Sequence, residues 1–338
     1  MKKVVLSVVA ALAVTAMATP VFAADIAMKK APAPPPPPPS PWDIAFGGGL
    51  MTDYVWRGVT QSGHQPSVTA FFEPRYNINS NLQLYAGVSG ESIRFANSAA
   101  AEIDFYGGIR PTFGPLALDF GIWEYYYPGG TCYGSGPLQP GPGFGGTASC
   151  LPVPWVNGNV AKDDASFYEV YAKATYTIDA WAFGPTFYYS PNFLNTGADG
   201  EYLSGIITFT APASMALFNG QVGWYVSGEF GHQWFGTSDP FYGVVGTPAP
   251  AAYAAGIPEP DYNTWNVGIG FTWKVFTLDL RYADTDLSKE ECSAFTSDPG
   301  ATVDGTPISI NPVGARSNWC GATFVAKLTT SLTLGSLK

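Results

Sequence analysis

The sequence predicts an all-β fold, specifically a transmembrane up-and-down antiparallel β-barrel of about twelve strands. Apolar and polar residues alternate with period two in about a dozen segments. No apolar run after the N-terminal segment reaches the roughly 20 residues that a spanning helix needs, which excludes a helical inner-membrane protein. All of the long connections fall between the same alternate pairs of segments, as in barrels with long extracellular loops and short periplasmic turns.

Residues 1–23 are predicted to be a secretory signal peptide. Lys2 and Lys3 precede an apolar run over residues 4–17, and Val21 and Ala23 suit cleavage after Ala23. The alternative, a transmembrane anchor, is disfavoured because this run is shorter than a spanning helix. We therefore expect export through the Sec pathway, with the cell outer membrane of a Gram-negative bacterium as the destination.

Residues 24–41 contain the run APAPPPPPPSP and are predicted to be a Pro-rich periplasmic spacer. Proline fixes φ and removes amide donors, so such a segment is polyproline II or disordered. Two interpretations remain, a plain stalk and a contact with peptidoglycan or another periplasmic partner.

The barrel itself is predicted over residues 42–338. Its predicted strands are residues 43–57, 67–79, 82–95, 101–113, 116–127, 166–178, 181–190, 201–211, 220–235, 262–273, 275–286 and 319–334. In the first strand, Tyr54 and Trp56 fall on the apolar face, where their amphipathic rings are expected at the lipid headgroups.

The predicted connections differ strongly in length. Short ones lie at residues 79–81, 114–115, 179–180, 212–219 and 274, and long ones at residues 128–165, 236–261 and 287–318. Every long connection follows an odd-numbered strand, so the long and short connections lie on opposite rims. An even strand count returns both ends of the barrel to the periplasmic side.

Charged residues fall almost entirely on the face opposite the apolar stripe. The predicted pore-lining residues are Glu73, Arg75, Glu91, Glu102, Asp104, Arg110, Asp119, Glu169, Lys173, Glu229, Asp279 and Arg281. With Asp53, Arg57 and Lys327, the inward set holds nine acids and six bases, which predicts weak cation selectivity. Aromatic residues on the same face either line a narrow solute path or fill it: Tyr85, Tyr106, Trp123, Tyr125, Tyr171 and Tyr225.

The net charge of the chain limits the classes of molecule that it is expected to bind. Without Lys2 and Lys3 the chain has 14 basic and 26 acidic residues, a formal charge of −12, which disfavours nucleic acid. The expected partners are outer-membrane lipid and lipopolysaccharide, the barrel assembly machinery and small-molecule solutes.

The four cysteines predict disulfides in an exported chain. Three pairings can be drawn, and we prefer Cys132 with Cys150 and Cys292 with Cys320, because each pair then belongs to one loop.

The end of the first predicted strand and the residues that follow it carry a motif. Asp53, Tyr54, Arg57, Gly58, Gln61 and Ser62 stand in the run DYVWRGVTQS. This run resembles the S-D-Y-x-x-R-G-x-[ST]-Q-S signature that opens the TorF family of predicted porins, and residues 84–90 are similar to that family's second marker. The resemblance covers residues 42–95 and implies an outer-membrane barrel with a channel role. Thr52 replaces the serine of the signature, and the chain ends without the usual terminal aromatic residue.

Three classes of function remain. The first is a channel for passive diffusion of small hydrophilic solutes, and the second is a non-conducting structural or surface-binding barrel. The third is a lipid hydrolase at the rim, which would need His64 or His232, the only histidines. We expect no enzyme activity, no cofactor and no metal, and interpret the acidic run at residues 284–291 as a solvated loop.

Overall fold

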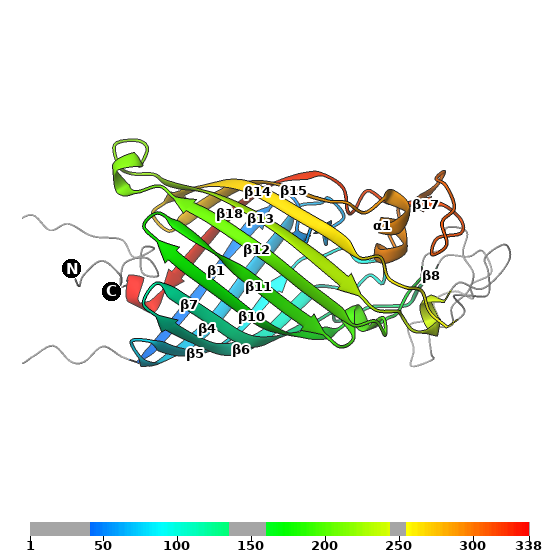
Figure 1. The fold of residues 1–338 in the computed structure, drawn as a ribbon, viewed down its shortest axis with the longest axis horizontal. Helices are drawn as coiled ribbons and strands as arrows, with labels where there is room; N and C mark the ends of the chain where they lie inside the picture. Colours follow the sequence, from blue (N-terminus) through cyan, green and yellow to red (C-terminus); the bar gives the residue numbers. More distant parts are fainter. Residues whose placement is uncertain (1–40, 135–159, 244–254, 338) are drawn as a thin grey trace, which may run out of the picture.

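The computed structural model describes residues 41–134, 160–243 and 255–337, which form a closed antiparallel barrel of twelve strands (Figure 1). The strands follow one another around the ring in chain order. Pairing of the last strand with the first, through contacts such as Gly48 with Thr330, closes the ring. The predicted fold class is therefore confirmed.

The barrel strands are β1 (Trp42–Met51), β4 (Ser67–Asn79), β5 (Leu82–Glu91), β6 (Glu102–Phe113), β7 (Leu116–Tyr126), β10 (Phe167–Ile178), β11 (Trp181–Ser190), β12 (Gly200–Thr210), β13 (Gly223–Phe235), β14 (Tyr262–Trp273), β15 (Phe276–Thr285) and β18 (Thr323–Thr333). The connections contain the short strands β2 (Val55–Trp56), β3 (Val59–Thr60), β8 (Tyr133–Gly134), β9 (Val160–Ala161), β16 (Thr302–Val303) and β17 (Ala315–Arg316). They also contain the helices η2 (Phe193–Asn195), η3 (Ala213–Met215), η4 (Pro240–Tyr242), α1 (Lys289–Thr296) and η6 (Leu334–Leu337).

All twelve predicted strands are present, and three of them differ by four or more residues at the loop end of the barrel. β1 ends at Met51 instead of residue 57, β5 ends at Glu91 instead of residue 95, and β18 begins at Thr323 instead of residue 319. The continuing residues leave the wall and pack against one another, which the period-two pattern does not distinguish from wall pairing.

The connections have the predicted asymmetry. Four turns at one end have only two residues between strands, and left-handed backbone at Gly114, Asp179 and Lys274 fits the tight hairpins that they form. The fifth connection at that end, between β12 and β13, spans residues 211–222. The predicted long connections at residues 128–165, 236–261 and 287–318 all lie at the opposite end. β1 begins and β18 ends at the end with the short turns.

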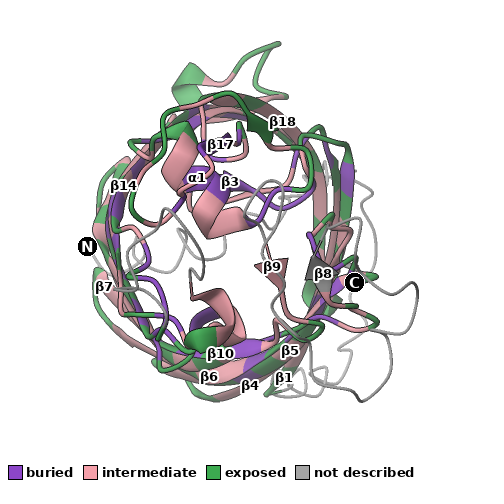
Figure 2. Ribbon diagram, turned by 90° about the vertical axis from the view of Figure 1, so that its right-hand side faces the viewer, coloured by how far each residue is buried: buried purple, intermediate pink, exposed green. Residues whose placement is uncertain are grey.

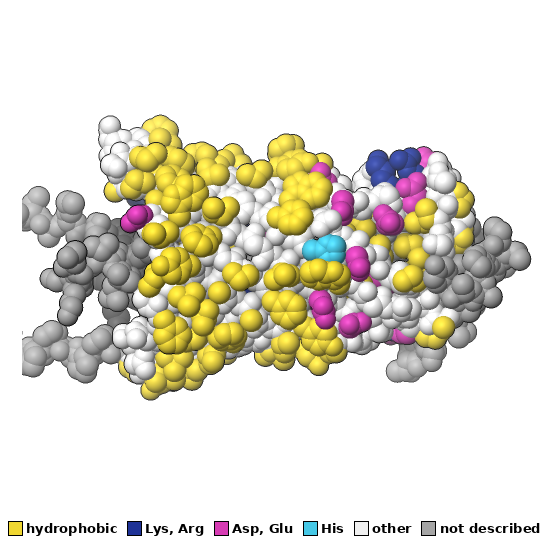
Figure 3. Space-filling model, in the orientation of Figure 1, with side chains coloured by type: hydrophobic (Ala, Val, Ile, Leu, Met, Phe, Trp, Pro, Cys, Tyr) yellow, Lys and Arg dark blue, Asp and Glu magenta, His cyan; other side chains and the backbone are white. Residues whose placement is uncertain are grey.

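The outer surface of the wall is apolar. Phe113, Phe230 and Leu328 are among many large apolar side chains that the strands expose. Figure 3 shows hydrophobic side chains over the wall toward the end with the short turns, and acidic side chains gathered toward the other end. Among the described residues, no helix combines the length and the apolar character needed to cross a membrane.

On the inner surface, aromatic rings lie against glycines of neighbouring strands. A Cβ atom added to Gly87 would be 2.3 Å from Cζ of Tyr106, and one added to Gly270 would be 2.1 Å from the ring of Tyr225. The glycines therefore create the space in which these rings rest along the wall.

The loop end is covered by elements that fold over the ring (Figure 2). Helix α1 begins at a capping box in which Ser288 and Glu291 exchange hydrogen bonds. The predicted disulfide between Cys292 and Cys320 is present and ties α1 to the segment that leads into β18. Cys150, the predicted partner of Cys132, lies outside the described residues, as do the signal peptide at residues 1–23 and nearly all of the spacer.

Candidate functional site

The first connection of the barrel folds into its interior. Residues 52–66, here called the lumen hairpin, contain β2 and β3, which pair Val55 with Thr60 and Trp56 with Val59. The turn between them holds two residues with left-handed backbone, Arg57 and Gly58. A Cβ atom at Gly58 would lie 2.4 Å from Cγ2 of Thr285, so only glycine fits there. The prediction of one continuous strand over residues 43–57 is thus wrong, because the chain turns inward after Met51.

Arg57 lies at the tip of the lumen hairpin and contacts four consecutive strands, β10 to β13. Its guanidinium donates to both carboxylate oxygens of Glu169, at 2.9 and 2.8 Å, and to Oε1 of Gln233 at 2.9 Å. The rings of Tyr188 and Tyr202 lie 4.8 and 4.3 Å from it. The side chains of Arg57 and Glu169 are 5% and 0% exposed, so this two-bond pair is shielded from solvent.

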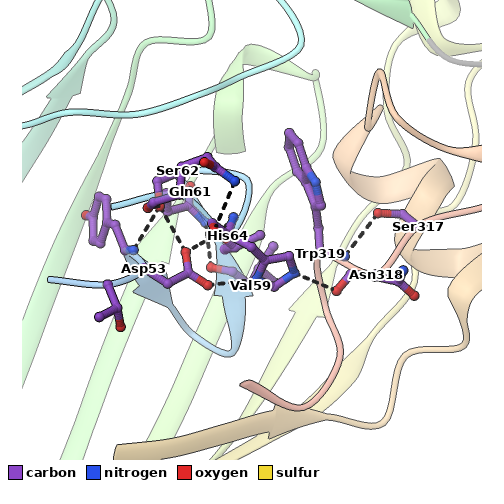
Figure 4. A network of polar contacts seen from close by, with 12 residues as sticks. Asp53, Val59, Gln61, Ser62, His64, Ser317, Asn318 and Trp319 are labelled. Atoms are coloured by element: carbon purple, nitrogen blue, oxygen red, sulfur yellow. Dashed lines mark hydrogen bonds and ion pairs between the residues drawn. The ribbon is translucent and has the colours of Figure 1, made fainter. Parts of the chain in front are cut away.

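The base of the lumen hairpin is organised by Asp53 (Figure 4). Its carboxylate accepts hydrogen bonds from the hydroxyls of Thr60 and Ser62 at 2.5 and 2.9 Å and lies 2.8 Å from Nδ1 of His64. Nε2 of His64 lies 3.1 Å from the carbonyl oxygen of Asn318, in the segment before β18. The hydrogen bond to Asp53 raises the pKa of His64 above its ordinary value.

The remaining motif residues also have contacts within this network. The side-chain amide of Gln61 donates to the carbonyl of Val59, and the backbone N–H of Gln61 donates to the carbonyl of Tyr54. All six motif residues, from Asp53 to Ser62, therefore belong to the lumen hairpin and lie outside the barrel strands.

The prediction that Tyr54 and Trp56 face lipid headgroups is wrong. The hydroxyl of Tyr54 donates to Glu102 at 2.5 Å, and the indole of Trp56 stacks on Phe193 with 5.9 Å between ring centroids. Both residues have an apolar ring with one polar group, which suits a mixed interior as well as a membrane interface. Trp56 belongs to a cluster of aromatic side chains from β7, β10, β13 and the loops, which includes Tyr125, Tyr127, Phe167, Phe193, Phe235 and Phe295.

Closer to the short turns, charged side chains on the wall contact one another across intervening strands. Arg110 on β6 donates to Glu73 on β4 at 2.8 and 3.1 Å and to Asp119 on β7 at 3.2 Å. The hydroxyls of Tyr85 on β5 and Tyr171 on β10 also meet. The contacts of Arg110 with Glu73 and of Tyr85 with Tyr171 skip strands of the ring, so these side chains lie on its concave side.

A second network lies on the opposite part of the wall. Arg281 on β15 donates to Asp279 and reaches Ser227 on β13 at 2.9 Å, and Tyr225 donates to Asp279 at 2.6 Å. Glu229 accepts hydrogen bonds from the neutral groups of Tyr202 and Asn266.

The structure places the other predicted lining residues as follows. Arg75 pairs with Glu73 at 2.5 Å, Lys173 lies 4.8 Å from the ring of Tyr171, and Lys327 is the register partner of Asp279. Glu91, Glu102 and Asp104 lie together near the loop end of the barrel. Gln233 lies on the inward parity of β13 and is fully buried, but it was not predicted, because only charged and aromatic residues were assigned to the inner face.

A cavity of about 70 Å³ lies among the loops, lined by residues that include Lys162, Tyr242, Glu259 and Phe295. Burial raises the pKa of Glu259 to about 8. This carboxyl is therefore mostly protonated at neutral pH and adds little negative charge to the loop end.

The two histidines do not have the contacts of a serine hydrolase. Oγ of Ser62 lies 2.9 Å from Asp53 and 2.7 Å from the carbonyl of Gln65, while His64 contacts Asp53 and Asn318. Nδ1 of His232 lies 2.8 Å from Asn263. A nucleophile held by a histidine is the arrangement that such chemistry requires, and among the described residues neither set of contacts includes one.

Comparison with known proteins gives a family match for part of the chain. A model described as a bacterial protein family of unknown function, Gcw_chp, matches residues 36–139, which include the lumen hairpin. A search of curated proteins finds no match.

Several solved barrels are similar to this chain. An outer-membrane channel from Pseudomonas putida F1 has a TM-score of 0.41 at 9% identity, over 89% of this chain and 100% of that one. The NanC porin has a TM-score of 0.37 at 7% identity, over 86% and 100%. OmpT of Vibrio cholerae has a TM-score of 0.34 at 12% identity, over 86% and 98%.

Proposed function

We propose that this chain is an outer-membrane channel through which small hydrophilic solutes diffuse, with a weak preference for cations. The observation that carries this proposal is the separation of the two faces of the wall. Charged side chains such as Arg110 and Glu73, or Arg281 and Asp279, contact one another inside the ring, and large apolar side chains cover its outside. A charge facing lipid at mid-depth costs on the order of 2 to 4 kcal/mol, so this separation suits a barrel in a membrane.

The orientation and the family resemblance support the same proposal. Long connections at one rim and short turns at the other are typical of outer-membrane barrels, in which the short turns face the periplasm. The resemblance of residues 52–62 to the TorF signature implies a channel role. The family model that matches residues 36–139 describes a family of unknown function, so it neither supports nor opposes this role.

A second candidate, a non-conducting structural barrel, is favoured by the docked lumen hairpin. Arg57 reaches side chains on β10, β11, β12 and β13 and so occupies part of the cross-section. A ring of twelve strands is also intermediate between filled barrels of eight strands and porins of sixteen.

Conductance of the purified barrel in a planar bilayer distinguishes these candidates. We expect a small steady conductance for the wild type and a larger one for Arg57→Met, because the variant no longer holds the lumen hairpin across the ring. Absence of current for both proteins would favour the structural barrel. Lipase activity that is lost in His64→Ala or His232→Ala would instead favour the rim hydrolase.

Ion selectivity is the sharper test of the channel. With nine inward acids against six bases, the lumen should favour cations in buffer that contains a chelator of divalent ions, and the preference should grow from 0.1 M to 0.01 M salt as the screening length increases from about 10 to about 30 Å. Glu229→Gln should weaken the preference without leaving a base unpaired, since the partners of Glu229 are neutral. A reversal potential that favours anions would contradict the proposal.

A further inference from the structure

Three carboxylates meet inside the barrel at the loop ends of β5 and β6. Glu91 and Glu102 are directly opposite each other in the ladder, and Asp104 is one inward position further along β6. One ligand atom from each of the three residues lies within 4.8 Å of the other two. Like charges directly opposite each other destabilise a pair of strands, so this arrangement needs a compensating group.

The protein satisfies only some of these oxygens. Glu102 accepts hydrogen bonds from the hydroxyls of Tyr54 and Tyr127, and Asp104 accepts one from Ser89. Oε2 of Glu91 and Oδ1 of Asp104 are buried without a hydrogen bond of good geometry to any described residue, and the nearest donor to Asp104, Nε1 of Trp123, is likewise buried without one. Asp104 is 3% exposed as a whole, so an acceptor there without a donor is costly.

Basic residues do not balance the cluster. Lys327 is near enough to Glu91 to attract it, but no ion pair within 4.0 Å joins Lys327 to an acid in the described part of the chain. With all three carboxylates ionised, the cluster and one ammonium carry about two negative charges. A divalent cation has the charge that compensates them.

We propose that Glu91, Glu102 and Asp104 form a Ca²⁺ site. Ca²⁺ binds carboxylate oxygens at about 2.3–2.6 Å, so two oxygens on one ion are separated by at most about 5 Å, which includes the observed spacing. Mg²⁺ binds at about 2.1 Å and would require the three groups to move closer together. Unpaired oxygens of Glu91 and Asp104 supply ligands, and water completes the coordination shell.

The site adjoins the lumen hairpin. Glu102 is held by the hydroxyl of Tyr54, whose backbone N–H donates to Ser62 at 2.9 Å within the hairpin. Ca²⁺ bound there fixes Glu102 and stabilises the docked hairpin. The site does not depend on the proposed channel, because ion binding requires no transport.

Tb³⁺ luminescence tests the site directly in the purified, detergent-solubilised full barrel. Tb³⁺ replaces Ca²⁺ at oxygen sites, and Trp123, which lies near Asp104, can transfer excitation to it. We expect sensitised emission that saturates at one ion per chain and is displaced by Ca²⁺ at lower concentrations than by Mg²⁺. No emission, or displacement by Mg²⁺ at equal or lower concentrations, would overturn the proposal.

Paired variants locate the bound ion. Glu91→Gln combined with Asp104→Asn should weaken Tb³⁺ binding at least tenfold, whereas Glu124→Gln, on the opposite face of β7 beside Trp123, should retain it. Unchanged binding in the first protein would overturn the site. Retained faster migration of unboiled samples on a detergent gel shows that each variant is folded. If the double variant is not folded, calorimetric titration of the wild type with Ca²⁺ measures the number of ions bound per chain. A value below about 0.5 ions per chain overturns the proposal.

Discussion

At the scale of single residues, Arg57 is the main attachment of the lumen hairpin to the wall. Arg57→Met would leave Glu169, which is fully buried, without its base. Breaking a buried pair by removing one partner costs about 3–5 kcal/mol. We therefore expect the hairpin to undock, and hydrogen exchange at residues 55–60 to accelerate by at least a hundredfold.

Two further variants separate the loss of the pair from other effects. Arg57→Met with Glu169→Leu removes both charges and should recover much of the protection, because apolar replacement of a buried pair is close to neutral. Arg75→Met should have little effect on the hairpin, since Glu73 keeps Arg110 as a partner. Protection of residues 55–60 that is unchanged in Arg57→Met would contradict this role.

His64 makes the base of the lumen hairpin sensitive to pH. Its pKa is raised in the folded protein, chiefly by the hydrogen bond to Asp53, so the protonated form is the one that the fold stabilises. This contribution is complete below the ordinary pKa of about 6.5 and is lost as the pH rises through the raised value. We expect faster local exchange at residues 60–65 at high pH, after correction for intrinsic rates.

The matching control is His64→Gln, which can keep a hydrogen bond to Asp53 but does not titrate. Its local exchange should show no such dependence between pH 6 and 9. The same dependence in wild type and variant would assign the effect to another group.

At the scale of elements, the disulfide between Cys292 and Cys320 joins α1 to the segment before β18. It closes a loop of 28 residues, and in the chain-entropy model such a cross-link stabilises the folded loop by about 3.6 kcal/mol. Reduction should increase protease cleavage between residues 288 and 318 and leave the β signal in circular dichroism unchanged. Loss of that signal would mean that the barrel itself depends on the bond.

The segment beside this disulfide also supports the lumen hairpin. Thr60 N–H donates to the carbonyl of Trp319, and the hydroxyl of Thr285 donates to the carbonyl of Cys320. Reduction should therefore also increase exchange at Thr60. The Cys292→Ser, Cys320→Ser protein lacks this disulfide. Comparing it with and without reductant controls for other effects of the reductant.

The twelve strands could be predicted because alternation, turn residues and connection lengths agree with one another along the chain. The inward path of the lumen hairpin could not. Residues 52–57 continue the alternation of β1, and Tyr54 and Trp56 are equally typical of a lipid interface and of a buried polar interior. The only local signal is Arg57-Gly58, because glycine permits a left-handed turn.

The partners of Arg57 were beyond prediction for a different reason. Glu169 could be assigned to the inner face by parity, but Tyr188, Tyr202 and Gln233 meet the guanidinium only because the ring brings four strands around one point. Parity gives the face of each strand and no information on depth or on contacts across the ring.

At the scale of the whole molecule, closure of the ladder leaves no open edge at which strands separate. Unboiled protein should therefore remain folded in dodecyl sulfate and migrate faster than boiled protein on the same gel. Identical migration would show that the ring does not close in the purified protein. A variant with a disrupted closing pair, Gly48→Pro, should lose the fast form at a lower temperature than wild type.

The contacts of the lumen hairpin also set an order of assembly. Arg57 is separated in sequence by 112 residues from Glu169 and by 176 from Gln233, so it cannot reach its final partners until β10 and β13 stand in the ring. Contacts between residues this far apart in sequence form late and slowly. A newly inserted barrel should thus be more permeable than the mature one for a short time. The extent of membrane leakage during biogenesis would then depend on the rate at which Arg57 pairs with Glu169.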